Sequence, residues 1–565
     1  MTFESKDLEN SHSREMDTKK DTNINIKSSP KSTKLVRTVY ISSALAALGG
    51  FVCGYDSGAV TGIMVMVPFI NSYSELADEN TYVYYSGLCF ALMLMTAAIG
   101  AFVSGPICDK IGRKWSIVMG AYIFALGILF EIIGQKFGLL LAGRLVAGFG
   151  NGLITNAVPL YHSEIAPPDI RGRLVTLFTV MASFGTVCGY FITFGTSYLT
   201  SQWAWRAPWI VQLVIAVFLG SFVIQLPYSP RWLFDIGQER ESLEVLAKLR
   251  ELPTDDPAVV AEYVEIKEQI SAEKSLGNRT YIELFYRKNL KATLIAFFIG
   301  IATSFTGINA ILYYGPSIFM DAGLSDVSTS IAASGGTAIV SFGATIVSFY
   351  LIDIWGRKKL FILGAILMGI AMFIVGAMFQ GYSYFDADGY VIMDNVGART
   401  VIIICIYVFM GSFNLTWGVA SYVYPAEIFN MRNRAKGLGL TYGLNWAFSI
   451  LVTYCMPLFM ASTLSGVYFF FGSCCIAITI VVFFIPETRN ITLEAMEGAK
   501  KSILSLQDRI GFGAEIIPSY RKQDNACVGI VSIYCGWWMF VCCQSDHHLN
   551  DSTRHNTSTQ FGLNL

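Results

Sequence analysis

The sequence predicts an all-α polytopic membrane protein, with twelve transmembrane helices in two six-helix bundles and a cytoplasmic helical linker between them. Three observations predict this class. Only 14% of the 565 residues are charged, against about 25% in ordinary soluble domains. About twelve apolar segments reach the roughly 20 residues that a membrane span needs. A basic hexapeptide, DKIGRK at 109–114, returns as DIWGRK at 353–358, as expected of a chain built from two equivalent halves.

The twelve predicted spans form two groups of six. Each span is a predominantly apolar stretch bounded by polar residues. They are expected near 39–66, 82–104, 116–134, 138–161, 174–199, 207–227, 290–313, 327–352, 359–380, 400–424, 437–461 and 465–485. The charged segment 228–289 separates the two groups. Its acidic and basic residues recur at helical spacing, which predicts short amphipathic surface helices.

The distribution of basic residues predicts how the chain lies in the membrane. The loop 67–85 has no Lys or Arg, whereas the next loop carries Lys110, Arg113 and Lys114. Because basic loops stay on the cytoplasmic side, both termini and the linker are expected in the cytoplasm. The predicted domains are a disordered N-terminus at 1–38, helix bundles at 39–227 and 290–485, the linker at 228–289, and a C-terminal tail at 486–565.

The tail contains an apolar stretch at 528–543 that is short for a membrane span. It is either an interfacial or palmitoylated segment or an artefact of gene annotation, and it is assigned no function.

Composition also argues against several classes of function. The net charge is −1 and no basic face is evident, so no nucleic-acid partner is expected. The twelve cysteines lack C-x-x-C or metal-ligand spacing, so neither a metal site nor a disulfide framework is predicted. No nucleophile–His–Asp set and no phosphate-binding Gly loop is present. An enzyme is therefore not expected, and neither is a cofactor.

A second motif also occurs twice. PLYHSEIAP at 159–167 and YPAEIF at 424–429 each place a Glu seven residues before an Arg. Further motifs are GRLVAGFGNG at 143–152, SPRWL at 229–233 and PET at 486–488. From about 40 to 500, this set resembles the sugar porter family of the major facilitator superfamily, and in particular fungal hexose or polyol transporters. The resemblance implies the major facilitator fold, with two bundles around a central cavity.

The duplicated charges are predicted to form a gate at the inner side. Ion pairs between spans there would hold the inner side closed and separate when it opens. The alternative is that basic residues only fix topology, which we favour for Lys110, Lys114 and Lys358. The predicted gating residues are Asp109, Arg113, Glu164, Arg171, Asp353, Arg357, Glu427 and Arg434.

Asp56 and Arg144 are predicted to pair within the membrane. Counted at 1.5 Å per residue, both lie roughly 10 Å below the outer surface, on the first and fourth spans. Intramembrane ionisable residues are usually functional, and a pairing that changes during transport would couple it to protons. The resemblance points to the same two positions. The alternative is a static structural pair, for which Glu131 competes as a partner of Arg144.

The candidate substrate contacts lie mostly in the second half. GINAILYY at 307–314 is followed by Gly315 and Pro316, which predicts a broken seventh span. Relative to the family, short hydroxyls replace long amides at three positions. The aromatic before the second Glu motif is a Tyr instead of the common Trp. The predicted contacts are Asn309, Tyr313, Tyr314, Thr303, Ser304, Thr179, Asn445, Trp446 and Tyr422. The alternative is that these side chains join helices. His162 is expected to be a solvated polar residue at the inner membrane end.

The sequence thus predicts transport of a monosaccharide, hexose or pentose, by alternating access with proton symport. A facilitated-diffusion uniporter, a polyol/proton symporter and a transporter-like sugar sensor are the alternatives. The expected partners are a sugar or polyol, protons and the lipid bilayer. The expected location is the plasma membrane.

Overall fold

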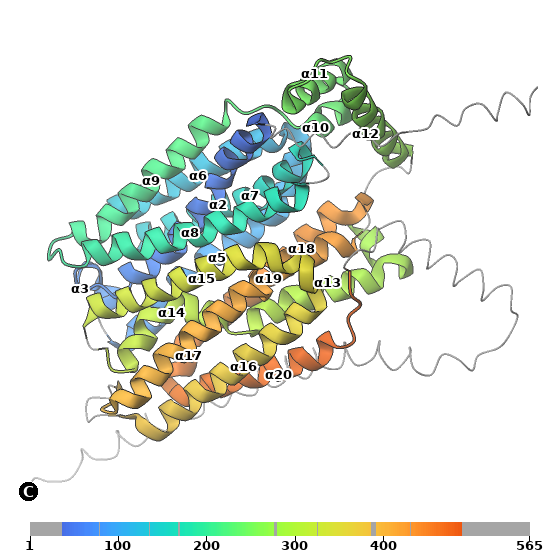
Figure 1. The fold of residues 1–565 in the computed structure, drawn as a ribbon. Coiled ribbons are helices and arrows are strands. Elements are labelled where there is room, and N and C mark those ends of the chain that lie inside the picture. Colours follow the sequence, from blue (N-terminus) through green and yellow to red (C-terminus); the bar gives the residue numbers. More distant parts are fainter. Residues whose placement is uncertain are drawn as a thin grey trace, which may run out of the picture.

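The computed structural model describes residues 37–488 except 78, 135, 168–169, 276–279, 325, 386–390 and 430. Twelve membrane-crossing helical segments are found within these residues, and they form two halves that lie side by side (Figure 1). The predicted all-α class and its twelve spans are thereby confirmed. The predicted disorder of the N-terminus and the apolar stretch 528–543 lie outside the described residues.

The first half consists of six long helices. Two short helices, α3 (Val67–Ile70) and α4 (Ser74–Ala77), connect the first two of them. The six long helices are α2 (Arg37–Ile63), α5 (Glu79–Ile111), α6 (Arg113–Ile133), α7 (Phe137–Ile165), α8 (Arg171–Thr196) and α9 (Trp203–Val223). Each of them overlaps the corresponding predicted span.

The second half has the same number of spans but two of them are broken. The first broken span is the pair α13 (Arg287–Phe305) and α14 (Ile308–Asp321), and the second is the pair α17 (Val396–Leu415) and α18 (Trp417–Ile428). The unbroken spans are α15 (Val327–Trp355), α16 (Arg357–Tyr382), α19 (Met431–Ser462) and α20 (Leu464–Val482). A two-stranded hairpin, β1 (Tyr384–Phe385) with β2 (Val391–Ile392), connects α16 to α17.

The seventh span is broken within the segment that the sequence singles out, but the break lies at Gly307, and Gly315 and Pro316 lie inside α14. Gly307 has a φ of +90°, which a glycine adopts readily because it lacks a Cβ. A second distortion lies at Tyr314, two residues before Pro316. The break in the tenth span at Thr416, with φ −124° and ψ −77°, was not predicted. Pro425 lies farther along α18 and does not mark it.

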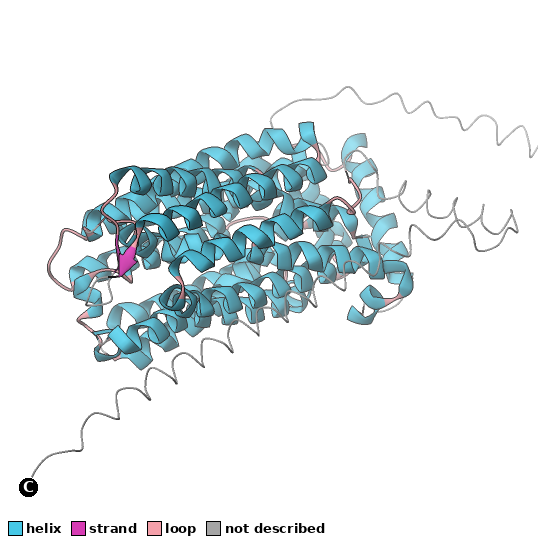
Figure 2. Ribbon diagram, turned by 90° about the horizontal axis from the view of Figure 1, so that it is seen from below, coloured by secondary structure: helices cyan, strands magenta, loops and turns pink. Residues whose placement is uncertain are grey.

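The linker forms short helices at one end of the bundle. They are α10 (Pro230–Asp235), α11 (Glu239–Arg250), α12 (Pro257–Ser275) and the 3₁₀ helix η2 (Tyr281–Phe285). Phe234, Leu246 and Val259 contribute to a small core of their own. We call this end of the bundle the linker end (Figure 1). The β1–β2 hairpin lies at the opposite end (Figure 2).

Close packing of α2 against α8 positions the centre of the first half. A Cβ on Gly54 would stand 1.8 Å from the carbonyl oxygen of Ala182, and one on Gly185 would stand 2.2 Å from that of Phe51. Glycines on both helices thus let the two backbones touch, as is common between membrane helices. This contact fixes the rotation of α2, and Asp56, two residues after Gly54, is turned toward α7 and α9 instead.

Candidate functional site

A cavity of about 240 Å³ lies between the two halves. Helices of both halves line it, among them α2, α7 and α8 on one side and α14, α15 and α18 on the other. Six of the predicted site residues lie in its wall, and they are Asp56, Arg144, Thr179, Tyr313, Tyr422 and Trp446. Ionisable, hydroxyl and aromatic side chains therefore meet in one cavity.

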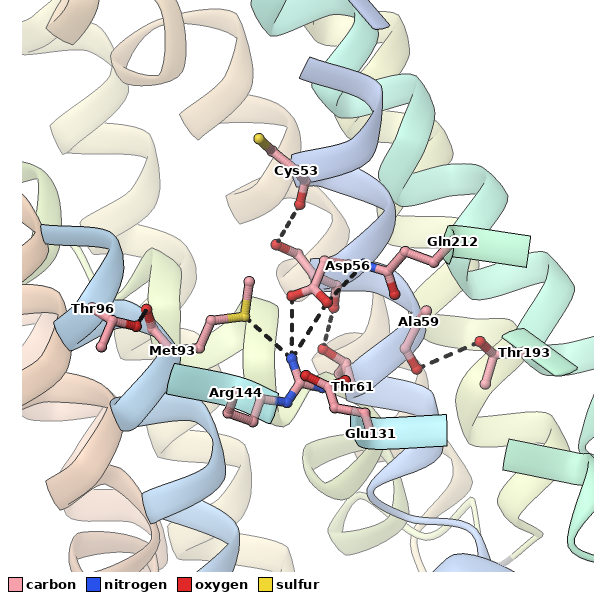
Figure 3. A network of polar contacts seen from close by, with 11 residues as sticks. Cys53, Asp56, Ala59, Thr61, Met93, Thr96, Glu131, Arg144, Thr193 and Gln212 are labelled. Atoms are coloured by element: carbon pink, nitrogen blue, oxygen red, sulfur yellow. Dashed lines mark hydrogen bonds and ion pairs between the residues drawn. The ribbon is translucent and has the colours of Figure 1, made fainter. Parts of the chain in front are cut away.

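The charged part of the wall is a buried network (Figure 3). Arg144 Nη1 lies 3.3 Å from Asp56 Oδ1, so the pair expected from matched depth is present. Gln212 of α9 donates a 2.8 Å hydrogen bond to the same Oδ1. Arg144 Nη2 lies 3.4 Å from Glu131 Oε2. The guanidinium also stands over the ring of Trp209, 5.8 Å from its centroid.

Five of the predicted substrate contacts are not among the residues that line this cavity. Their polar atoms are engaged in bonds that mostly tie α13 and α14 to α19. Asn309 donates to Ser449 at 2.7 Å, and Ser304 donates to the carbonyl of Asn445 at 2.9 Å. The same applies to Asn445, which donates to Gly300, and to Tyr314, which donates to Thr453, while Thr303 bonds within α13 to Ile299. Their role in binding stays a prediction.

The cavity also contains polar residues that the sequence analysis missed. Thr337 and Ser341 of α15 line it. They belong to a run of buried hydroxyls at Ser330, Ser334, Thr337, Ser341, Thr345 and Ser348. That run repeats every three or four residues, which is the signal of one helix face and could have revealed it. Other lining residues that were not predicted are Thr155, Thr186, Tyr190 and Asn414, which lie outside the motifs, and Asn151, which belongs to the motif at 143–152.

The gating residues of the first half come together at the linker end. Arg113, at the start of α6, lies 2.9 Å from Glu164 at the end of α7. It also lies 3.4 Å from Asp109, four residues earlier, and donates to the carbonyl of Cys108. The pair joins two helices of the same half. The side chain of Arg171 lies outside the described residues.

The second half repeats this arrangement. Arg357 lies 2.7 Å from Glu427 of α18 and donates to the carbonyl of Ile352, the counterpart of Cys108. Glu487, in the PET motif, accepts hydrogen bonds from the backbone N–H groups of Arg357 and Lys358. Arg434 is half-buried, and the side chain of Asp353 lies outside the described residues.

His162 differs from its prediction. It was expected to be a solvated residue, but its side chain is fully buried. Its Nε2 lies 3.0 Å from the carbonyl oxygen of Ser43 on α2. The prediction was wrong because α7 continues to Ile165 and packs against α2 there, so the helix end is covered by its neighbour.

Two halves of six spans around one cavity, with matched charged pairs at one end, define a carrier of the major facilitator type. The family model described as "Sugar (and other) transporter" matches residues 42–499. The chain therefore belongs to this family. Family membership is also consistent with a protein that is not an enzyme.

Named relatives agree with this assignment. The major facilitator-type transporter ecdD of Aspergillus rugulosus is 31% identical over 86% of this chain and 91% of its own length. Hexose transporter HXT9 of Saccharomyces cerevisiae is 32% identical over 81% of each chain. Among solved structures, the proton:xylose symporter XylE bound to 6-bromo-6-deoxy-D-glucose has a TM-score of 0.70 at 22% identity, covering 82% of this chain and 99% of that one. This last likeness concerns the fold.

Proposed function

We propose that the protein transports a monosaccharide across the membrane by alternating access, together with a proton. The observation that carries this proposal is the cavity between the halves with the Asp56–Arg144 pair in its wall. A substrate bound there touches both halves, so their relative movement would open the cavity to one side at a time. The same movement would alter the surroundings of the pair.

The lining chemistry suits a sugar. Sugar hydroxyls need donors and acceptors, and Thr337, Asn151 and Asn414 provide them. The apolar face of a sugar ring packs on aromatic rings, and Tyr313 and Trp446 are available for this. The hexose transporters among the relatives support the same substrate class. No lining residue favours a hexose over a pentose or a polyol.

Contacts of α14 suggest how one side closes. The carbonyl of Leu312 accepts hydrogen bonds from Thr61 of α2 and Tyr190 of α8. Tyr313 and Tyr314 pack against Phe90 of α5, with ring centroids 5.0 and 5.6 Å apart. All these contacts cross between the halves on the far side of the break at Gly307. A short helix that is hinged at a glycine is suited to move as a gate.

Proton coupling would follow from the chemistry of the pair. An Asp56 carboxylate that faces cavity water binds a proton by forming an Oδ–H bond, and its attraction to Arg144 then falls. Because the paired and unpaired states have different energies in a low-dielectric interior, proton binding would bias the conformational equilibrium. If the pair is instead static, the protein is a uniporter. The observation that favours a uniporter is that Gln212 and Arg144 both bond to Asp56 and hold it in place.

We further propose that the linker end faces the cytoplasm and that the protein resides in the plasma membrane. The duplicated basic motifs lie at that end, as the preference of basic residues for the cytoplasmic side requires.

Uptake of labelled hexoses, pentoses and polyols by transporter-null cells, with and without a protonophore, tests the proposal. We expect saturable uptake of a monosaccharide that collapses with the protonophore. Uptake that survives the protonophore would make the protein a uniporter. Uptake of none of the compounds would favour a sensor.

A further inference from the structure

The buried guanidinium of Arg144 faces two carboxylates. Asp56 approaches it from α2 and Glu131 from α6 (Figure 3). The exposed fractions of the three side chains are 5% or less. With all three groups ionised, the cluster carries a net charge of −1, and one bound proton brings it to zero. Because an unpaired charge in the membrane interior costs several kcal/mol, proton binding and pairing must be linked here.

The two carboxylates are held differently. Asp56 lines the cavity and accepts a hydrogen bond from Gln212 as well as from Arg144. Glu131 is fully buried and is not among the residues that line the cavity. Neither of its carboxylate oxygens has a hydrogen-bond partner among the described residues, and its carboxylate forms an ion pair with Arg144. Asp56 therefore faces the cavity, whereas Glu131 lies behind the cavity wall and forms an ion pair with the guanidinium.

Helix packing brings Glu131 to this place. A Cβ on Gly143, the residue before Arg144, would stand 2.7 Å from Cγ of Glu131. A Cβ on Gly127 would stand 2.3 Å from the backbone nitrogen of Ala147. Glycines on α6 and α7 thus remove the bulk that would otherwise separate the glutamate from the arginine. The contact depends on a close approach between two helices rather than on a flexible side chain.

Besides Arg144 and Asp56, the titratable groups near Glu131 among the described residues are a thiol and a phenol, and the next cation lies beyond the phenol. Cys89 of α5 and Tyr73, which precedes α4, are near its carboxylate. Free thiols and phenols are neutral at that pH. Arg206 of α9 lies close to Tyr73 and stacks on Trp205, 4.8 Å from the ring centroid. The charge balance at the centre is therefore set by Asp56, Glu131 and Arg144.

We propose that Glu131 is a second anionic partner of Arg144 during transport and takes over the pairing when Asp56 binds the transported proton. This inference rests on the proposed proton symport. The proton passes from the cavity to Asp56 Oδ and is later released on the other side, while the attraction of Arg144 favours the ionised form of the buried Glu131. Without Glu131, protonation of Asp56 would leave the guanidinium unpaired in an apolar interior. Glu131 is thus a positioning residue that makes proton binding compatible with burial.

Replacing Glu131 by Gln tests this role. In the Glu131→Gln variant the cluster is neutral when Asp56 is ionised and +1 when it is protonated, so proton binding needs a more acidic medium. We expect the external pH at half-maximal sugar uptake to fall by about one unit or more. Sugar-induced proton uptake should fall with it. Asp326→Asn is the control, because it removes an exposed acid at the start of α15 in the other half while an Asn can keep the helix cap, and it should leave the pH profile unchanged.

The outcomes separate the inference from the function on which it rests. If a protonophore does not reduce wild-type uptake, both the proposed proton symport and the role of Glu131 are overturned. Proton-coupled wild-type uptake, with an unchanged pH profile in Glu131→Gln, would overturn the role of Glu131 alone. If the Glu131→Gln variant does not reach the membrane, the same measurement is made on the Glu131→Asp variant. Its carboxylate stands farther from Arg144, so a smaller acid shift is expected, and an unchanged profile would again refute the proposal.

Discussion

The two copies of the repeated basic motif have the same backbone but different neighbours. Gly112 has φ +86° and ψ 157°, and Gly356 has φ +85° and ψ 161°. In the first half, the ring of Trp232 from the linker covers the glycine and its Nε1 donates to the carbonyl of Asp109. In the second half, the carboxylate of Glu487 covers it instead. The local turn is thus repeated, whereas the segment fastened to it is specific to each half.

The membrane interiors of the two halves differ more strongly. The first half contains the cluster of Asp56, Glu131 and Arg144. Counted from the repeated Arg and Glu of the gate motifs, the counterparts of Glu131 and Arg144 are Val375 and Tyr407. Neither can carry a charge in the apolar interior at neutral pH. The gate is therefore shared by both halves, while the proposed proton site belongs to the first half alone.

Breaking the charged cluster has the largest expected effect. We expect Asp56→Asn to abolish accumulation of sugar against a gradient, because no carboxylate then faces the cavity to take the proton, while exchange down a gradient persists. The measurement is the ratio of internal to external labelled sugar in energised cells. Tyr407→Phe, at the counterpart of Arg144, should keep accumulation. Full accumulation by Asp56→Asn would end the assignment of the proton site to the first half.

Removing one of the two gate ion pairs is expected to have an effect of intermediate size. Arg113 and Glu164 are 12% and 10% exposed, whereas Arg357 and Glu427 are 10% and 31% exposed. Loss of such a pair is expected to shift the conformational equilibrium by about 1–3 kcal/mol, or 5–150-fold. Loss of the more buried pair, Arg113–Glu164, is expected to shift it more than loss of Arg357–Glu427. Arg113→Gln should therefore reduce the initial rate of uptake more than Arg357→Gln does. Equal rates at equal surface expression would show that burial does not rank the two gates.

Substituting Gly112 and Gly356 tests how the different neighbours of the two repeated turns affect stability. Their φ and ψ values lie in a region that is essentially restricted to glycine, so Gly112→Ala and Gly356→Ala should each cost about 1–3 kcal/mol. At Gly356 a Cβ would also meet the Glu487 carboxylate at 2.8 Å and disturb its two backbone bonds. Thermal unfolding in detergent should show a lower Tm for both variants, with the larger drop for Gly356→Ala. A Tm that is unchanged in either would contradict the strained backbone.

The smallest expected effect concerns the surface of the linker. Hydrogen bonds from Lys267 and Tyr263 lower the pKa of Glu239, which is exposed. A carboxylate whose pKa is lowered by folding stabilises the folded state at pH values above the ordinary pKa of a glutamate. This contribution is lost as the pH falls through the lowered pKa of the folded state. Because exposed pairs contribute little, Glu239→Gln should leave Tm unchanged at neutral pH and in acid alike. A clear loss at neutral pH only would show that this linker pair matters.

The candidate site was partly predictable. The Asp56–Arg144 pair could be inferred from depth, because two ionisable residues at equal depth in apolar spans have few other partners. The hydroxyl-bearing face of α15 was also visible as a helical repeat, although it carries no motif. In contrast, whether Asn309 points into the cavity or toward Ser449 depends on how α14 rotates against α19, and no spacing within either segment encodes that.

The sequence by itself determined the number of spans, their approximate bounds, the duplication and the flexible glycine at 307. These properties follow from hydropathy, helix rise and the freedom of glycine, which act over short stretches of chain. Only the tertiary structure decided that His162 is buried, that the tenth span breaks at Thr416 and that Glu131 reaches Arg144. Such features depend on the closeness of helices that are distant along the chain. Glycine contacts such as those of Gly127 and Gly143 set that closeness.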